Sequence, residues 1–553
     1  MHKLIIIILA VIASGCNHEP PASLTPNNDV EAEANNEPEF IKSAHYFSSA
    51  WPITFWQEFE EDDVADELQQ IKNDGFNTVV LVVPWRGFEI GFDNEETKSN
   101  PVLYQRLTLI LKAIVAHDLK FILRLGFPHF HMAEAKTYAL EQCIGIYTDE
   151  KTQNHWTGYL ENIKQTVKPF QASSAGTLVS WEDFWCPHAM FPYWEDQERL
   201  DMAHDMGYDK WLQQQNQNMV KVLLQRSDIK FNEIKIPQPA DFSYVLYLDF
   251  IDQMFVQKVL KPAQTVFPNA AMEIRVDKLP IKEKEHYTWI SHDLHLEESN
   301  LRGSYWAPFW GAENKGELIS AEQALMNFKY FLNVVTDDGQ NINHVIEQFN
   351  FYDNTIHYPN NANIKPEEID AFLLGAAPLF KQYSRGFGVW AYRDYHDNAI
   401  LNGSFEMGTE GWHIEGQAAI RTESQDQSLW MPAGAAINQT FLPEKRFKLL
   451  ALYEEISICL LTDSATTFDI IVDGELISEW HKESDQNCTQ LPATPFMKPH
   501  PITITLTLLT HSDVLIDEIK VYGFTQVLGL YDAKGNPSNH LSSYRQLNTL
   551  LEE

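Results

Sequence analysis

The sequence predicts an α/β (β/α)8 TIM barrel joined to an all-β sandwich. Apolar runs alternate with amphipathic stretches between residues 44 and 395, which is the pattern of parallel strands connected by crossover helices. After Tyr395 the runs become shorter, and Asp, Gly, Pro and Asn separate them at intervals typical of a sandwich. The length of 553 residues also exceeds what one hydrophobic core usually organises, so at least two domains are expected.

Eight apolar runs are expected to form the strands of the barrel. A closed barrel fits this number better than an open sheet, because no Gly-rich phosphate loop follows the first run. The expected strands cover residues 44–50, 78–84, 121–126, 177–182, 272–276, 303–308, 344–349 and 386–392.

Amphipathic helices are expected between these strands. In the first, over residues 62–74, Val64, Leu68 and Ile71 recur at spacings of three and four, and Gly75 ends the helix. Similar helices are expected over 247–266, 321–335 and 366–382. The long stretches at 147–167 and after residue 183 are expected to form loops or a subdomain over the mouth of the barrel.

The chain continues beyond the sandwich with a helix-like stretch over residues 541–551. The sandwich is therefore expected to be inserted before the last helix of the barrel, an arrangement that folded domains tolerate. The expected domains are a signal over 1–16, a disordered tether over 17–39, a barrel over 40–397, a sandwich over 398–524, and a return to the barrel over 525–553.

The first sixteen residues combine a short basic start, an apolar run over 4–12 and small residues before Cys16. The run is too short to span a bilayer. It resembles a bacterial lipoprotein signal, which implies cleavage before Cys16 and lipidation of its thiol; an ordinary secretory signal is the alternative. Asn17, rather than Asp, follows the cysteine, and by the same resemblance this favours the outer membrane. The Pro-, Asn- and Glu-rich stretch that follows reads as a disordered tether.

The net charge and the cysteines indicate which classes of binding partner, disulfide and cofactor to expect. A formal net charge of −36 argues against nucleic acid, because Lys and Arg drive that binding; solubility of an exported protein accounts for most of the acidity. Cys459 and Cys488 lie in one expected domain and form the favoured disulfide, and Cys143 with Cys186 is a second candidate. No cysteine has metal-ligand spacing, so neither a metal nor another cofactor is expected.

Two glutamates end two of the expected strands, Glu182 the fourth and Glu347 the seventh. Carboxyl ends of parallel barrel strands meet at one face. A carboxyl pair there suits glycosidic bond cleavage, with retention at about 5–5.5 Å separation and inversion at about 6.5–9.5 Å. Burial beside Trp181 would keep Glu182 protonated, while Glu347 stays ionised. The alternative for either glutamate is a salt-bridged or solvated residue. Asp183 is the rival acid, but neighbours on a strand point to opposite sides.

Residues 44–395 resemble the retaining glycoside hydrolases of the large TIM-barrel superfamily that includes cellulases, mannanases and β-galactosidases. In that superfamily an acid/base glutamate ends strand four and a nucleophilic glutamate ends strand seven, which implies these roles for Glu182 and Glu347. Trp181 stands where the superfamily usually has an Asn that binds the sugar 2-hydroxyl. The type of sugar is therefore left open.

Other strand ends supply candidate contacts to a carbohydrate substrate. Aromatic faces stack on pyranose rings, and Arg and His bind hydroxyl or carboxylate groups. The resemblance implies that Trp390 floors the subsite beside the scissile bond and that Tyr305 donates to the nucleophile. The alternative is core packing for each tryptophan and an internal ion pair for Arg124. The candidates are Trp85, Arg86, Arg124, His129, His131, Trp181, Asp183, Tyr305, Trp306, Trp390 and Tyr392.

The sandwich opens with residues 402–412 and closes with 514–522, and both stretches resemble jelly-roll carbohydrate-binding modules and their galactose-binding-like relatives. Trp412 and Trp430 could form a sugar platform, although core packing is the favoured alternative. Taken together, the chain is expected to be an envelope-anchored hydrolase of a β-linked glycan. The alternatives are a non-catalytic polysaccharide-binding or export lipoprotein on the same scaffold and a transglycosylase.

Overall fold

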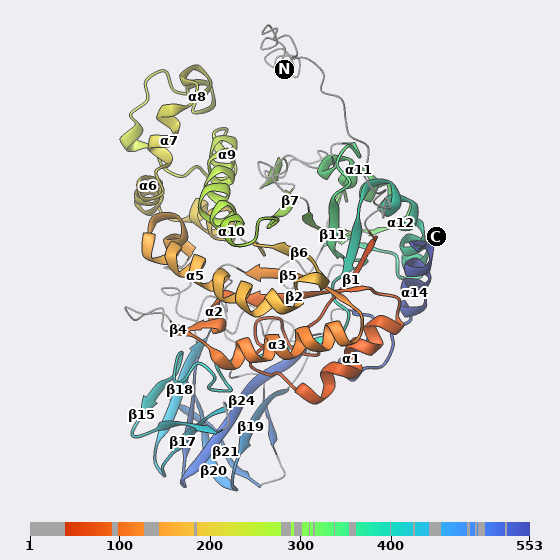
Figure 1. Ribbon diagram of the computed structural model, residues 1–553. Coiled ribbons are helices and arrows are strands. Elements are labelled where there is room, and N and C mark those ends of the chain that lie inside the picture. The colour runs from red at the N-terminus through yellow and green to blue at the C-terminus, as the bar shows by residue number, and fades with distance from the viewer. Residues whose placement is uncertain are drawn as a thin grey trace, which may run out of the picture. The chain divides into compact units, whose positions relative to one another are not determined.

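The computed structural model divides the chain into two units, residues 1–39 and 40–553. The described helices and strands all belong to the second unit (Figure 1). No helix within the described ranges has the length and apolar character needed to cross a membrane. The structure describes residues 39–90, 98–126, 143–181, 185–277, 289–291, 301–308, 310–312, 314, 316–336, 338–352, 361–398, 400–423, 426–441, 455–483, 487–492, 495, 504–525 and 528–552.

Eight parallel strands form the barrel, which confirms the predicted fold class. They are β1 (Ile41–His45), β2 (Thr78–Pro84), β5 (Lys120–Gly126), β6 (Ser174–Leu178), β7 (Glu273–Asp277), β9 (Arg302–Trp306), β11 (His344–Phe349) and β13 (Gly386–Val389). Their order is β6-β5-β2-β1-β13-β11-β9-β7. The ring closes between β6 and β7, where Val179 N–H donates to the Ala271 carbonyl at 2.8 Å and Ala271 N–H donates to the Thr177 carbonyl at 2.9 Å.

Two predicted strands lie three residues too late in the sequence. The first was expected over 44–50 and is Ile41–His45; the fourth was expected over 177–182 and is Ser174–Leu178. Polar or small residues lie in the first half of both true strands, Lys42 and Ser43 in β1 and Ser174 to Gly176 in β6, and they gave no apolar signal. The second and seventh strands have the predicted bounds, because both are rich in β-branched and aromatic residues.

The first helix, α1 (Glu61–Asn73), follows the prediction. Val64, Leu68 and Ile71 are buried, and Gly75 takes the left-handed backbone conformation, φ +85°, that follows a helix end. The other helices are α2 (Trp85–Phe88), α3 (Pro101–Ala116), α5 (Glu150–Val167), α6 (Asp196–Asp205), α7 (Tyr208–Gln214), α8 (Gln217–Leu223), α9 (Tyr244–Phe255), α10 (Lys261–Val266), α11 (Ala321–Val335), α12 (Ile369–Tyr383) and α14 (Leu541–Leu550).

The stretch 147–167, expected to be a loop or subdomain, is mostly the long helix α5. Its N-terminus is capped because the Asp149 side chain accepts from Thr152 N–H at 2.9 Å. Trp156, Tyr159 and Ile163 then bury one face of the helix. The stretch after residue 185, the other one expected to form loops or a subdomain, carries α6, α7 and α8.

Two antiparallel sheets follow the barrel, in the orders β16-β17-β24-β19-β22, with β14 paired to β24, and β15-β18-β23-β20-β21. Trp412 is buried, and its Nε1–H donates to the Asn402 carbonyl at 2.9 Å, so it packs the core as the alternative held. Sugar binding by this module stays a prediction. The strands are β14 (Tyr395–Asn398), β15 (His413–Glu415), β16 (Ala419–Glu423), β17 (Asp426–Met431), β18 (Ala436–Phe441), β19 (Glu455–Thr462), β20 (Thr466–Val472), β21 (Glu475–Lys482), β22 (Cys488–Pro492), β23 (Ile504–Thr510) and β24 (Val514–Thr525). Short paired strands elsewhere are β3 (Glu89–Ile90), β4 (Lys98–Ser99), β8 (Trp289–Ser291), β10 (Leu318–Ile319) and β12 (Asn363–Ile364).

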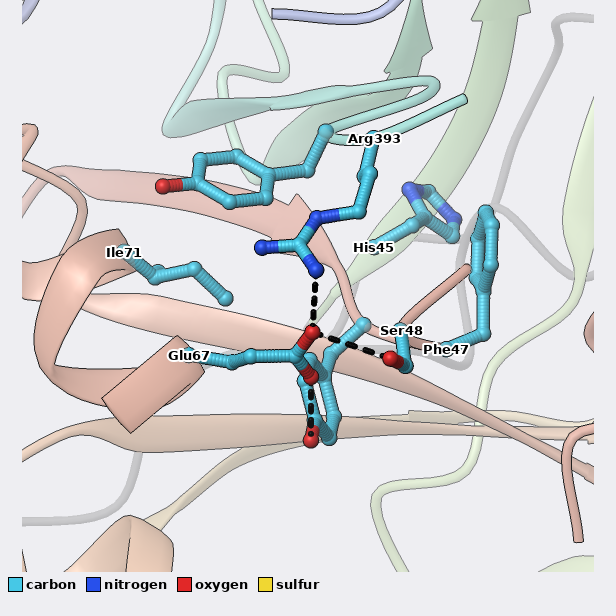
Figure 2. Close-up of a pocket in the computed structure, with 8 residues that line it drawn as sticks. His45, Phe47, Ser48, Glu67, Ile71 and Arg393 are labelled. Carbon is cyan, nitrogen blue, oxygen red and sulfur yellow. Dashed lines mark hydrogen bonds and ion pairs between the residues drawn. The ribbon is translucent and has the colours of Figure 1, made fainter. Parts of the chain in front are cut away.

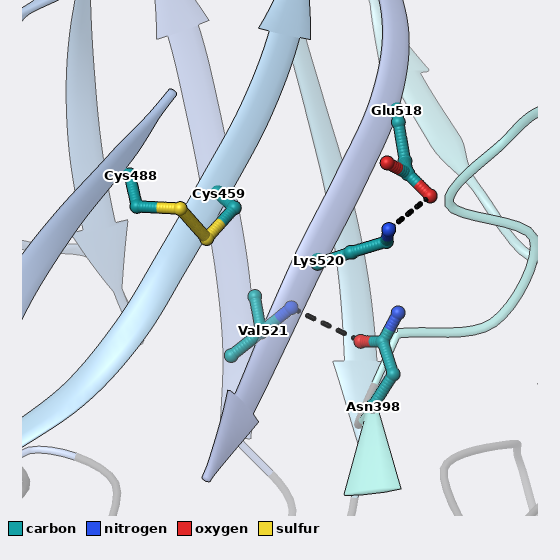
Figure 3. Close-up of a disulfide and its surroundings, with 6 residues drawn as sticks. All are labelled: Asn398, Cys459, Cys488, Glu518, Lys520 and Val521. Carbon is teal, nitrogen blue, oxygen red and sulfur yellow. Dashed lines mark hydrogen bonds and ion pairs between the residues drawn. A yellow bond between two sulfur atoms is a disulfide. The ribbon is translucent and has the colours of Figure 1, made fainter. Parts of the chain in front are cut away.

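Both candidate disulfides are present. Cys459 and Cys488 are directly opposite each other on β19 and β22 (Figure 3). Cys143 and Cys186 link the segment before α5 to the segment after β6, with their Cα atoms 6.3 Å apart.

Polar contacts tie the first turn of the sandwich to the barrel. Arg106 on α3 lies 2.8 Å from the fully buried carboxylate of Glu406, and the Asn100 amide donates to the Glu406 carbonyl at 2.8 Å. A second contact joins Asn398 to both parts: its amide donates to Glu58 at 3.0 Å, and its oxygen accepts from the Val521 N–H of β24 at 3.0 Å (Figure 3). Burial raises the pKa of Glu58 to about 7.

Asp74, at the C-terminal end of α1, holds the returning segment against the barrel. It is 1% exposed. Tyr392 and Tyr531 donate their hydroxyls to its Oδ2 at 2.5 and 2.9 Å, and Arg545 of α14 donates to its Oδ1 at 2.8 Å. One carboxylate therefore fastens the segment after β13, the segment after the sandwich and the last helix.

We expect Asp74→Ala to lower the free energy of unfolding by about 2–3 kcal/mol, because two buried hydroxyls and a guanidinium lose their shared acceptor. Urea denaturation followed by circular dichroism measures the change. Asp66→Ala, at an exposed position of the same helix, is the control and should stay within about 0.5 kcal/mol of wild type. A similar small change in Asp74→Ala would contradict the role given to this carboxylate.

Candidate active site

The interior of the barrel is built in layers that follow the two-residue repeat of the strands. The lower layer is apolar and consists of Ile41, Val80, Ile122, Leu178, Ala271, Leu301 and Val345. Two residues further along β5, β7 and β11, the same face carries Arg124, Glu273 and Glu347, all 0% exposed. A charged layer thus lies directly above an apolar one, at the carboxyl-terminal part of the strands.

Glu347 is the centre of this charged layer. Its Oε2 accepts from Arg124 Nη1 at 2.8 Å and lies 3.4 Å from His45 Nε2. Its Oε1 is buried and accepts no hydrogen bond from the described residues. One oxygen is therefore held firmly, and the other has unused acceptor capacity.

Arg124 connects two carboxylates. Its Nη2 donates to Glu273 Oε2 at 2.7 Å while Nη1 serves Glu347. Its Nε also donates to the Ser180 carbonyl at 3.3 Å. Such charge-assisted bonds favour the anionic form of a carboxylate. Arg124 therefore forms an internal ion pair, which was the alternative to a sugar contact. One partner in that ion pair is Glu347, the candidate nucleophile.

His45 contributes a neutral ring beside Glu347. Burial is the largest influence and lowers the pKa of His45, although the carboxylate of Glu347 opposes this shift. A neutral imidazole holds one ring proton, and the acceptors within reach are Glu347 Oε2 and the Val389 carbonyl, 3.2 Å from Nδ1.

Three tryptophans gather around this charged layer. Trp181 lies with its ring 5.6 Å from that of Trp51 and 6.0 Å from that of Trp390. Arg124 lies over the Trp181 ring at 5.5 Å, and His45 meets Trp390 edge-on at 4.9 Å. Trp181 is buried, whereas Trp51 and Trp390 are partly exposed, so the latter two present aromatic surface around Trp181.

Glycines on both strands that flank β11 make room for Glu347. A Cβ atom on Gly303 of β9 would lie 3.1 Å from Glu347 Cγ and 2.8 Å from Leu178 Cδ1. A Cβ atom on Gly388 of β13 would lie 2.5 Å from the Glu347 carbonyl oxygen. A side chain at Gly303 would press on the side chain of Glu347, and one at Gly388 would press on its backbone.

Two predicted sugar-binding tryptophans are core residues instead, as the alternative held. Trp85 is 1% exposed and packs on Trp156, with ring centroids 5.5 Å apart. Trp306 is 0% exposed and packs on Phe328 and Phe331 of α11 at 5.0 and 5.6 Å. Trp306 lies on the outward face of β9, towards α11, and Trp85 is the first residue of α2 and packs on α5, so assigning them to the substrate was wrong.

Arg86 and Tyr392 also have structural partners. Arg86 lies 3.0 Å from Glu410 of the sandwich, and the Tyr392 hydroxyl is bound to the buried Asp74. Both side chains are committed to joining parts of the fold, which corrects their assignment as sugar contacts.

A small pocket near Tyr392 is separate from the Glu347 carboxylate, although His45 lines both. Figure 2 shows its polar centre, where Glu67 accepts from Arg393, Ser48 and Tyr46. These groups satisfy one another, so the pocket presents no reactive carboxylate.

Tyr305 remains a candidate for the site. It lies two residues after Gly303 on β9, so both residues are on the interior face of that strand, where Gly303 adjoins the Glu347 side chain. Tyr305 is partly exposed. The expected hydrogen bond from its hydroxyl to the nucleophile stays a prediction. Glu182, Asp183, His129, His131 and Cys16 lie outside the described residues.

Three residues of this site were not predicted from the sequence: His45, Trp51 and Glu273. His45 is the last residue of β1, but the strand was placed too late, so it did not stand at a strand end. Trp51 follows the same misplaced strand. Glu273 had a visible signal, a charged residue at the start of the expected fifth strand. Among described side chains, no group of three or more His, Cys, Asp and Glu is arranged to hold a metal ion.

Comparison with known proteins assigns no family. No family model matches the sequence, and no curated protein matches it. Solved structures with a related arrangement include the exo-beta-1,4-mannosidase Op5Man5 from Opitutaceae bacterium strain TAV5, with 12% identity, a TM-score of 0.39, and coverage of 65% of this chain and 53% of that one. Others are GH5_18 from Streptomyces cattleya in complex with GlcNAc (12% identity, TM-score 0.39, 65% and 72% coverage) and the endo-1,4-beta-mannanase from Rhizomucor miehei (11%, 0.38, 65% and 87%). Likeness this distant carries neither activity nor substrate to this chain, which also spans only about half of the mannosidase.

Proposed function

We propose that this protein is a glycoside hydrolase that cleaves a β-linked glycan with retention of configuration. The observation that carries the proposal is the Glu347 carboxylate, which is buried at the carboxyl end of a barrel strand with Oε2 bound to Arg124 and Oε1 unengaged by the described residues. An oriented carboxylate with one available oxygen is suited to attack an anomeric carbon. Trp51 and Trp390 supply aromatic surface on which a pyranose ring would stack.

The reaction would proceed in two displacements. Glu347 Oε1 attacks the anomeric carbon and forms a glycosyl ester as the bond to the leaving oxygen breaks, and Glu182 gives its proton to that oxygen. Water, deprotonated by Glu182, then cleaves the ester and regenerates Glu347. The role of Glu182 rests on its place in the sequence, shortly after the fourth barrel strand. The role of Glu347 rests on its place in the seventh strand and also on its contacts with Arg124 and His45.

The full-length protein should release reducing ends from at least one member of a panel of β-linked polysaccharides, and Glu347→Ala should lower kcat at least about 10³-fold, because no nucleophile remains. A reducing-sugar assay measures both. Glu322→Ala, at an exposed position of α11, is the matched control and should keep wild-type activity.

Azide distinguishes a lost nucleophile from a damaged site. With an aryl β-glycoside, Glu347→Ala plus azide should form a glycosyl azide of inverted configuration, because the small anion enters the space of the missing carboxylate. Full hydrolysis by Glu347→Ala would sink the proposal, and binding of glycans by a wild type that hydrolyses none would point instead to a polysaccharide-binding protein.

The acid/base role of Glu182 predicts a dependence on the leaving group. Glu182→Ala should lose about 10²–10⁴-fold in kcat/KM on natural glycans, which need a proton on the leaving oxygen. On aryl glycosides with an activated leaving group the first step needs no proton, so the loss in kcat/KM should be far smaller. Equal losses on both substrates would assign the acid elsewhere.

We further propose that a lipid on Cys16 anchors the protein to the bacterial envelope, in keeping with the signal-like start of the sequence. Cells fed an alkyne fatty acid should yield a labelled protein, and Cys16→Ser should take no label, since its hydroxyl does not replace the thiol. Label on the Cys16→Ser protein would refute the anchor, and a secreted, unlabelled wild type would favour an ordinary signal.

A further inference from the structure

Glu273 is a second fully buried carboxylate in the charged layer, and the two-displacement reaction gives it no task. It is the first residue of β7 and is 0% exposed. Its Oε2 accepts from Arg124 Nη2 at 2.7 Å, and its backbone N–H donates to Ser180 Oγ at 2.6 Å. A buried carboxylate is costly unless its charge is compensated, so its presence calls for a physical explanation.

Pairing of the candidate nucleophile does not explain Glu273, because Arg124 alone is a sufficient partner for the Glu347 carboxylate. Among the described residues Arg124 is bonded to both carboxylates, so Glu347 shares its guanidinium with Glu273.

The geometry of the guanidinium does explain it. An Arg fork readily binds both oxygens of one carboxylate through two parallel bonds. Here the two Nη atoms go to different carboxylates, Nη1 to Glu347 and Nη2 to Glu273. By occupying Nη2, Glu273 keeps the fork from closing on Glu347, and no described residue engages Oε1 of Glu347.

The orientation of this fork is fixed from a third side. Ser180 accepts from Arg124 Nε through its carbonyl, at 3.3 Å, and from Glu273 N–H through its hydroxyl. The Trp181 ring lies under the guanidinium at 5.5 Å. The guanidinium plane can thus turn only if the bond to Glu273 is given up.

We propose that Glu273 is a positioning residue that holds Arg124 in a monodentate bond to Glu347 and so keeps the nucleophilic oxygen available. The inference rests on the proposed function, since it assigns Oε1 of Glu347 as the attacking atom. Glu273 acts through Arg124 and touches no reacting atom.

Two substitutions in the full-length protein separate this role from simple packing. Glu273→Ala frees Nη2 to bind Glu347, so kcat on an aryl β-glycoside should fall about 10²-fold with little change in KM. Glu273→Gln keeps an acceptor for Nη2 and should retain kcat within about tenfold. A loss confined to kcat, and its rescue by Gln, are results that a merely structural role of Glu273 would not give.

A matched control is Glu406→Gln, because Glu406 is also 0% exposed and paired with an arginine, Arg106, but belongs to the sandwich. Its kcat should stay at the wild-type value. A kcat unchanged in Glu273→Ala, or a kcat that falls as far in Glu273→Gln as in Glu273→Ala, overturns the inference. If Glu273→Ala does not fold, as judged by its circular dichroism, Glu273→Leu, which keeps the volume without an acceptor, takes its place. Should Glu347→Ala retain activity, the proposed function fails by itself; should only the Glu273 variants behave as wild type, this inference alone fails.

Discussion

The buried guanidinium of Arg124 is the constraint on which the interior of the barrel depends. It joins three strands, β5, β7 and β11, through two carboxylates, and it does so without access to solvent. A buried charge of this kind is tolerated only when every donor finds a partner. The surrounding residues follow from that requirement: small Gly303 and Gly388 leave volume for Glu347, and Ser180 accepts at Nε.

Burial of the apolar layer beneath the charged layer offsets the free-energy cost of burying these charges. Side chains such as Val80, Ile122 and Val345 close the lower part of the barrel, so the charged layer does not have to supply the stability of the core. The outward faces of the strands pack on the helices, where Trp306 and Phe349 contact α11 and α12. The buried charges of Arg124, Glu273 and Glu347 are thereby confined to one level of the barrel interior.

A buried polar group also holds several segments together where the chain returns to the barrel after the sandwich. Asp74 fastens three separate segments, and Glu406 and Asn398 fasten the sandwich itself. The sandwich lies between β13 and α14 in sequence, so both of its ends must be held near the barrel for the last helix to pack. Tyr392 serves that purpose, which is why an aromatic residue close to a strand end proved to be structural.

The sequence was sufficient for the fold class because strands such as Thr78–Pro84 and His344–Phe349 are unbroken apolar or aromatic runs. It was sufficient to place Glu347 in the carboxyl-terminal half of the seventh strand, because that strand is visible as such a run; the role of Glu347 as nucleophile stays a prediction. It was insufficient wherever the answer depended on which face of a strand a residue occupies. Tyr305 and Trp306 are adjacent, yet one lies on the face of Gly303 and the other packs on α11; a shift of one residue in register reverses that assignment.

The misplaced first strand shows why polar sites hide from pattern analysis. Interior positions of β1 and β7 carry Ser43 and Glu273 rather than apolar residues, because they adjoin the charged layer. A rule that equates burial with apolar character therefore fails most at the level where the site is built. It follows that the weak points of the sequence pattern in a barrel are informative: a buried strand that reads as polar marks the layer in which charges are paired, and Glu273 was visible in the sequence for that reason.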